Sequence, residues 1–345
     1  METKIYDLLR VDQYNEAIRE ASEAISDGGI VVFPTETVYG LGANALDPKA
    51  VEKIFIAKGR PNDNPLIVHI ARAEDIFVVA SHVSEDCRKL MEAFMPGPIS
   101  IVVPKSEKIP YCCTAGLETV AVRCPLRREA RDFIAACKVP IAAPSANISH
   151  KPSPTLPEHV LTDMLGKADV ILTAGGCDIG LESTVVDITG SKPAILRPGA
   201  ITPAMISEVL GKKTVRSYEA SSSDTPKAPG MKYSHYKPEA HLICLHAPKK
   251  AADEYINARI SSEELAKKGK VACAVFDSQK PDCENTWYLG KPEEKRKAAS
   301  LLFNYLRRCD SEGITTAFFM CDEQGEEGEA YANRLHKAAD EIVYL

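Results

Sequence analysis

The sequence predicts an α/β protein with two domains, a larger mixed-sheet domain over residues 1–215 and a smaller, doubly wound domain over residues 241–345. Three observations predict this fold class. Helical apolar spacing alternates with short apolar runs along the first stretch. Residues 216–240 are rich in Ser, Pro and Lys and lack apolar periodicity, which is typical of a flexible linker. The alternation of strand and helix patterns then resumes to the end of the chain.

The first domain begins with a helix that leads into a buried strand. Residues 13–28 place Ala17, Ala21 and Ile25 at helical spacing and end in glycine, and an apolar run at 30–33 follows. Residues 48–58 repeat the helical pattern, with proline near its start. The remaining elements expected here are a helix at 85–94 and strands at 66–70, 99–103, 119–123, 141–143, 170–172, 185–187 and 195–197.

The second domain is expected to be a small parallel, Rossmann-like unit, because strands and helices alternate again. The expected strands are 241–245, 271–276 and 317–321, and the expected helices are 251–265, 293–308 and 329–339. The preceding linker gathers aromatic and polar side chains that a passive tether does not need, and so we expect it to pack over something. These residues are Met231, Lys232, Tyr233, His235 and Tyr236.

Composition limits the classes of function. A net charge of −6 argues against a basic nucleic-acid-binding module, so any RNA contact relies on a local patch, such as Arg127, Arg128 and Arg131. The eleven cysteines are scattered, without a CxxC pair or metal-ligand spacing, which predicts free thiols in a reducing cytosol and no metal site. No apolar run approaches the roughly 20 residues that span a bilayer, so we expect a cytoplasmic protein without a membrane partner.

The stretch FPTETVYGLGA, residues 33–43, follows a buried strand with two threonine hydroxyls, a carboxylate and a phenol. Polar groups at a strand end, followed by glycines that let a ligand approach the backbone, indicate a small-molecule site. We expect Gly40-Leu41-Gly42 to form the floor of that site. The alternative is an ordinary strand exit in which Thr35 caps a helix.

Lys58 and Arg60 lie one residue apart in AKGRPNDNPLIVH, a loop stiffened by two prolines, which also contains Asn64 and His69. A planar guanidinium beside a compact ammonium suits phosphate groups. The alternative is a solvated helix C-terminus, where the helix dipole favours cations.

Two further segments place hydroxyls, amides and arginines after short strands. APSANISHKPSPT contains Ser145, Asn147 and Ser153, which could bind a ligand or could satisfy their own backbone in a turn. ESTVVDITGSKPAILRPG contains Ser183 and, at a strand end, Arg197. Such groups, without paired carboxylates or a Cys–His nucleophile, suit catalysis by positioning and charge neutralisation.

Six motifs in register resemble the YrdC-like family. They are FPTETVYGLGANA, KGRPNDNPLIVHI, MPGPISIVVP, TVAVRCP, APSANISHKPSPT and STVVDITGSKPAILRPGAIT. With APGMKYSHYKP and the second α/β domain, the chain is similar to the long, two-domain threonylcarbamoyl-AMP synthases. The resemblance implies a YrdC-like twisted mixed sheet in the first domain and a nucleotidyltransferase that condenses L-threonine, bicarbonate and ATP into threonylcarbamoyl-adenylate and pyrophosphate.

The resemblance also implies roles for individual residues. The family's KxR and SxN signature falls on Lys58, Arg60, Ser145 and Asn147, of which Lys58 and Arg60 would be catalytic. Threonine would be bound by Thr37, His69, Arg123, Ala143 and Ser183. ATP would be bound by Arg60, Asn64, Thr119, Ser145, Asn147, Ser153 and Arg197. Lys232, Tyr233, His235 and Tyr236 would close over the pocket as a lid, because a carbamate needs protection from water.

Mg²⁺ is expected to arrive with ATP, and the adenylate is expected to pass to a threonylcarbamoyl transferase complex that modifies tRNA beside the anticodon. The main rival is a non-enzymatic RNA-binding or ribosome-assembly module of the same family, which would bind RNA and ignore threonine. A second rival is carbamoyl-adenylate chemistry with another acceptor, as in hydrogenase maturation. The zinc-finger and acylphosphatase modules that usually accompany that role are absent from the sequence.

Overall fold

A computed structural model describes residues 2–218, 236–262, 269–277, 281–322 and 325–345. Two compact units divide the chain. The first unit consists of residues 1–149, 153–178 and 182–233, and the second of residues 150–152, 179–181 and 234–345. Among the described residues, no helix has both the length and the apolar character needed to cross a lipid bilayer.

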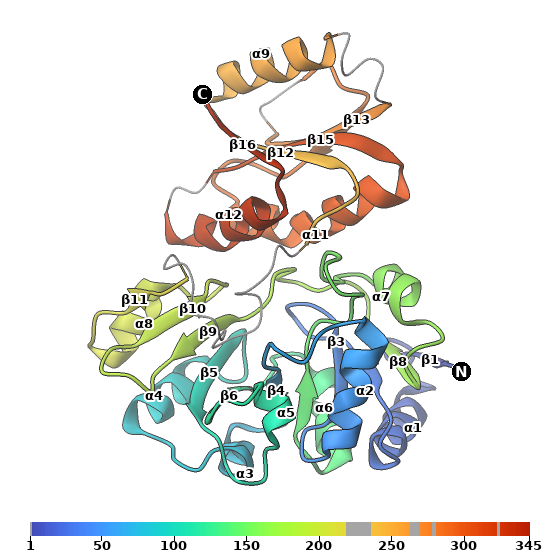
Figure 1. The fold of residues 1–345 in the computed structure, drawn as a ribbon, viewed down its shortest axis with the longest axis vertical. Coiled ribbons are helices and arrows are strands. Elements are labelled where there is room, and N and C mark those ends of the chain that lie inside the picture. The colour runs from blue at the N-terminus through green and yellow to red at the C-terminus, as the bar shows by residue number, and fades with distance from the viewer. Residues whose placement is uncertain (1, 219–235, 263–268, 278–280, 323–324) are drawn as a thin grey trace. The chain divides into compact units, whose positions relative to one another are not determined.

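The first unit is built on a mixed sheet, whose eleven described strands run in the order β1-β8-β2-β3-β7-β4-β6-β5-β9-β10-β11 (Figure 1). The strands are β1 Lys4–Asp7, β2 Val31–Phe33, β3 Gly40–Asn44, β4 Ile67–His69, β5 Ile99–Pro104, β6 Thr119–Arg123, β7 Ile141–Ala143, β8 Val170–Thr173, β9 Thr184–Asp187, β10 Ala194–Arg197 and β11 Val215–Arg216. The helices are α1 Tyr14–Ser26, α2 Pro48–Lys58, the 3₁₀ turn η1 Ala73–Asp75, α3 Ile76–Val79, α4 Glu85–Phe94, α5 Tyr111–Thr114, α6 Arg128–Cys137, α7 Pro157–Met164 and α8 Pro203–Leu210. The mixed sheet expected from the sequence is confirmed.

Helix α2 shows how local sequence sets the bounds of an element that carries site residues. The side chain of Asp47 accepts a hydrogen bond from the backbone N–H of Lys49, and Pro48 occupies the first turn, where no N–H is needed. Gly59 caps the end of the helix in a left-handed conformation with φ 61°. Lys58 is therefore held at the last helical residue, one step before the chain turns.

The two faces of the central strands differ in what they pack against. Ile67 on β4 lies opposite Ala121 on β6, and Ala121 lies opposite Val102 on β5, so these three side chains share one face. They belong to a small apolar cluster. We call the face of the sheet on which these three side chains lie the site face. Val68 and Val122, their chain neighbours, point to the opposite face and belong to the main hydrophobic core. The site face is therefore the one that is not used for the main core.

The second unit contains a sheet whose described strands run in the order β14-β13-β15-β12-β16, with every pair parallel. Helix α9 covers one face, and α11 and α12 cover the other (Figure 1). The elements are β12 His241–His246, α9 Lys249–Ile260, β13 Lys270–Val275, β14 Asn285–Tyr288, α11 Lys295–Ser311, β15 Ile314–Met320, α12 Glu326–Ala338 and β16 Glu341–Tyr344. This arrangement confirms the expected doubly wound, Rossmann-like fold.

The glycines of the first motif have a different role from the one expected. Gly40 and Gly42 lie in strand β3, which pairs antiparallel with β2. A Cβ added to Gly40 would lie 2.9 Å from the ring of Phe33, and one on Gly42 would lie 2.6 Å from Ile141 Cγ2. The expected floor is therefore wrong at these side-chain positions, because core side chains already fill the space that the glycines leave.

The proposed lid falls mostly outside the described residues. Lys232, Tyr233 and His235 lie there, and nothing is stated of their structure. Tyr236 is described, and its ring is buried against Phe303 of α11, with ring centroids 4.9 Å apart, within the second unit. The lid and the expected linker bounds of 216–240 remain predictions.

Replacing Gly42 by alanine should destabilise the first unit by about 1–3 kcal/mol, because the new methyl group would overlap Ile141 and Phe33 in a packed core. Gly190→Ala is the matched control, since the nearest atom to its added Cβ is 3.9 Å away. Denaturant unfolding of both variants measures the difference. Equal stability of the two variants would contradict the packing role of Gly42.

Candidate active site

A buried arginine at the end of β6 organises the site face. Arg123 lies opposite His69, the last residue of β4, and both side chains are buried. The Arg123 guanidinium donates one hydrogen bond of 2.8 Å to Thr37 Oγ1 and another of 2.7 Å to Glu36 Oε1. Since Glu36 and Thr37 belong to the connection between β2 and β3, the arginine anchors that connection to the sheet.

Thr35 shapes the same connection from within. Its hydroxyl donates to the carbonyl of Val38 at 2.6 Å and accepts from the backbone N–H groups of Thr37 and Val38 at 3.2 and 3.3 Å. No helix follows it, because the next described helix begins at Pro48. The helix-capping alternative for Thr35 is therefore wrong, and the residue closes a local turn that presents Glu36 and Thr37 to Arg123.

The buried ion pair leaves one acceptor and one donor unsatisfied. Glu36 Oε2 and Arg123 Nε are both buried and have no hydrogen-bond partner among the described residues. Buried polar atoms without partners are uncommon and costly, so these two atoms call for a partner such as a ligand or a water molecule. Glu36 was missed by sequence analysis, although a carboxylate flanked by two threonines directly after a buried strand was visible there.

His69 is an uncharged neighbour of this pair. Burial, and after it the positive charge of Arg123, lower its pKa from 6.5 to about 3. Its Nδ1 lies 3.2 Å from the carbonyl of Ile67, and its ring packs edge-on against Phe33 with centroids 5.7 Å apart. A neutral imidazole fixed in this way can exchange hydrogen bonds with a ligand without adding charge.

Lys58 connects the two halves of the KxR and SxN signature. Its ammonium group donates to the backbone carbonyls of Ser145 and Asn147, the latter at 2.6 Å, and lies 3.3 Å from Asn147 Oδ1. The hydroxyl of Ser145 donates to the same Oδ1. The structure therefore brings these three signature residues together, with the lysine buried at 3% exposure.

Arg60 and Asn64 lie in the loop that follows α2. The Arg60 guanidinium donates a 2.9 Å hydrogen bond to the carbonyl of Asn64 and lies 5.7 Å from the centre of the Phe55 ring. Asn64 is buried, and its Oδ1 has no partner among the described residues. Arg60 as a whole is only partly buried.

Ser183 and Arg197 lie together beyond β5. Ser183 Oγ is 2.8 Å from Ser100 Oγ, and Arg197 donates to both the carbonyl and the hydroxyl of Ser183 at 3.1 Å. Arg197 is opposite Val185, which in turn is opposite Ser100, so the three project on the site face. Ser100 gave no sequence signal, because an isolated serine in an apolar strand has no motif of its own.

The other expected residues take separate positions. Ala143 is opposite Ile67, on the site face. Ser153 is buried and donates a 2.7 Å hydrogen bond to Glu182, a partner that sequence analysis also missed. Thr119 lies at the opposite end of β6 from Arg123, on the same face but roughly 13 Å away at the rise of an extended strand. Thr119 is therefore not in contact with Arg123.

Sequence comparison identifies both parts of the chain. The Sua5, YciO and YrdC family model, described as telomere recombination, matches residues 23–199. A second family, described as the threonylcarbamoyl-AMP synthase C-terminal domain, matches residues 201–340. This chain belongs to the Sua5/YrdC family. Its two-domain architecture, which the resemblance of the linker and of the second α/β domain implied, is confirmed by the two matches.

Relatives in this family match along nearly the whole chain. A threonylcarbamoyl-AMP synthase from Pyrococcus abyssi is 44% identical, with 96% of this chain and 95% of the relative covered. One from Bacillus subtilis is 39% identical, with 93% and 92% covered. Among solved structures, Sua5 from P. abyssi complexed with L-threonine superposes with a TM-score of 0.91 at 42% identity, with both chains covered completely.

Replacing His69 by glutamine should weaken the acid sensitivity of the protein. Because the folded-state pKa lies below the unfolded value, the unfolded chain takes up a proton between pH 6.5 and about 3, and stability is lost as pH falls through that window. Without that histidine, the free energy of unfolding should fall less steeply there, by up to about 1.4 kcal/mol per pH unit. Denaturant unfolding across the window measures this slope.

The control is His150→Gln, which removes an exposed imidazole instead. Parallel profiles for His69→Gln and the parent would show that the buried imidazole is not the group that titrates.

Proposed function

We propose that this chain is a threonylcarbamoyl-AMP synthase that condenses L-threonine, bicarbonate and ATP into L-threonylcarbamoyl-adenylate and pyrophosphate. The observation that carries the proposal is the buried Arg123–Glu36 pair, with one donor and one acceptor unsatisfied, in a chain that is 42% identical to a Sua5 solved with L-threonine. The named activity of relatives that match nearly end to end supports it.

An amino acid suits the unsatisfied atoms of this pair. A zwitterion carries a carboxylate, which would accept from Arg123 Nε, and an amino group, which would donate to Glu36 Oε2. Thr37, His69, Ser183 and the backbone at Ala143 complete our proposed threonine site. His69 remains neutral, so the amino acid would meet one fixed positive charge and one fixed negative charge.

The proposed reaction has two bond-forming steps. The amino nitrogen, after losing a proton, attacks the bicarbonate carbon, and a C–O bond breaks as water leaves, which gives a carbamate. A carbamate oxygen then attacks the α-phosphorus of ATP, and the bond to the β-phosphate oxygen breaks to release pyrophosphate. The residues contribute by holding the reactants in position and countering negative charge, which requires no covalent enzyme intermediate.

We assign ATP to Arg60, Asn64, Thr119, Ser145, Asn147, Ser153 and Arg197. Arg60 is the proposed phosphate ligand of this group, because the residue is only partly buried and a planar guanidinium matches the geometry of phosphate oxygens. Lys58 already binds two backbone carbonyls, so its catalytic role would include holding the Ser145–Asn147 segment as well as countering charge. Mg²⁺ would enter as part of the nucleotide substrate, bound to phosphate oxygens.

We further propose that the enzyme works in the cytoplasm and passes its adenylate to a transferase complex that modifies tRNA. The possible tRNA contact and the lid of Lys232, Tyr233, His235 and Tyr236 belong to the same proposal. One solved P. abyssi Sua5 carries alanines in place of an adjacent histidine and tyrosine, the residue types that form the pair His235–Tyr236 in this chain. The solved variant covers 99% of this chain with a TM-score of 0.92.

Pyrophosphate release from ATP and bicarbonate should require L-threonine. The purified full chain is supplied with ATP, Mg²⁺, bicarbonate and one amino acid at a time, and pyrophosphate and the adenylate are measured. In this assay, Arg60→Ala should lower kcat by about 10²–10³-fold, because a donor to the reacting phosphates is lost. Arg72→Ala is the matched control, since the Arg72 side chain is 75% exposed and pairs with Asp75.

Release that is independent of threonine would overturn the proposed reaction. RNA binding by the same preparation without such release would favour the RNA-binding alternative. Equal activity of the Arg60 and Arg72 variants would contradict only the assignment of Arg60 and would leave the proposed reaction intact.

A further inference from the structure

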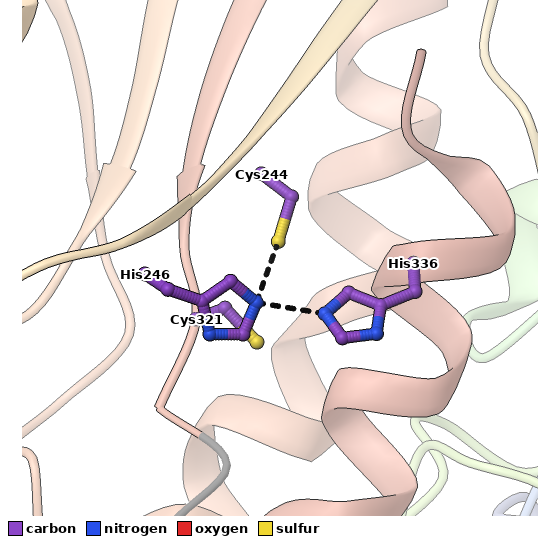
Figure 2. A group of neighbouring side chains, drawn as sticks. All are labelled: Cys244, His246, Cys321 and His336. Carbon is purple, nitrogen blue, oxygen red and sulfur yellow. Dashed lines mark hydrogen bonds between the residues drawn. The ribbon is translucent and has the colours of Figure 1, made fainter. Parts of the chain in front are cut away.

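Two cysteines and two histidines, which the proposed reaction does not use, lie close together in the second unit. Cys244 and His246 are two positions apart on β12 and so point to the same face of the sheet. Cys321 directly follows β15, and His336 lies in the last turn of α12. Figure 2 shows the four side chains directed toward one centre.

The fold brings the four together from distant parts of the sequence. β12 and β15 are parallel neighbours in which Leu245 is opposite Met320, so their carboxyl ends meet at one edge of the sheet. The backbone N–H of Cys321 donates to the carbonyl of Leu245 at 2.8 Å, which fixes the two ends together. α12 then returns along the sheet and places His336 against His246.

The distances suit a single small ion. His246 Nε2 lies 2.7 Å from His336 Nε2 and 3.6 Å from Cys244 Sγ, and all four ligand atoms are within 4.8 Å of one another. Bond lengths of about 2.3 Å to sulfur and 2.0–2.1 Å to nitrogen put the ligand atoms of a tetrahedral zinc site roughly 3.3–3.8 Å apart. Shifts of about an ångström would therefore complete a tetrahedron.

The burial and the chemistry of the four side chains narrow the choice of metal ion. Cys244 and Cys321 are buried, with exposures of 0% and 5%, while the two histidines are half-buried. Two thiolates with two imidazoles form a donor set typical of zinc, whereas Mg²⁺ and Ca²⁺ prefer oxygen ligands. Four protein ligands leave no open position, which is the pattern of a structural rather than a catalytic site.

We propose that Cys244, His246, Cys321 and His336 bind one zinc ion in a tetrahedral site. The two thiols lose their protons to solvent as the ion binds, and the ion ties the ends of β12 and β15 to the end of α12. The sequence predicted no metal site because that prediction relied on cysteines spaced a few residues apart. Here the ligands come from three elements, and only the Cys-x-His step in β12 is local.

The full chain, purified without chelators, should contain about one zinc ion per molecule when its metal content is measured by inductively coupled plasma mass spectrometry. Removal of the ion by a chelator should lower the thermal unfolding midpoint, because the ion binds the folded chain preferentially. Cobalt(II) added to the chelated protein should give the intense visible bands of a tetrahedral centre and a thiolate charge-transfer band.

The variants Cys321→Ser and His336→Asn should each lower the zinc content at least about tenfold. Cys309→Ser and His241→Asn are matched controls from the same unit, because Cys309 is equally buried and His241 lies on β12 with its ring 2.7 Å from Glu341. Both should retain the ion. The parent protein alone decides the question if a variant fails to fold.

Zinc-free parent protein without the cobalt spectrum would overturn the proposal. A Cys244–Cys321 disulfide in protein kept under reductant would overturn it as well. So would full zinc content in a folded variant that lacks both Cys321 and His336.

Discussion

The salt bridge between Arg123 and Glu36 is the interaction on which the candidate site depends. Both side chains are almost completely buried, at 4% and 3% exposure, and removal of one partner from such a pair typically costs about 3–5 kcal/mol. The bridge joins the end of β6 to the connection between β2 and β3. Two strands, β7 and β4, lie between β3 and β6 in the sheet order. Together with the Arg123–Thr37 hydrogen bond, it anchors Glu36 and Thr37 at the end of β6.

The pleat of the sheet explains why so many site residues converge. His69 and Arg123 are each two residues beyond an apolar residue of the site face, Ile67 or Ala121, and therefore point to the same face. Their neighbours point into the main core. The register that packs one face consequently places polar groups on the other, and a slip of one residue would move both sets together.

The sequence predicted the strands and helices well where apolar runs or helical spacing were clear, as for α2 and the parallel sheet of the second unit. It failed where the decisive contacts are tertiary. Gly40 and Gly42 resembled a ligand floor because the ring of Phe33 cannot be located from sequence. Glu36 had no assigned role, because only the fold reveals that Arg123 reaches it, and the Cys–His cluster joins residues up to 92 positions apart.

In the proposed threonine site, the Arg123–Glu36 pair binds the two charged ends of the amino acid, and calorimetric titration with L-threonine measures that binding. Glu36→Gln keeps the shape of the side chain and removes its charge. We expect the affinity of this variant for threonine to fall at least about tenfold, or roughly 1.4 kcal/mol, while its affinity for ATP is retained. Unchanged threonine affinity in the folded variant would show that the Glu36 carboxylate does not bind the amino group.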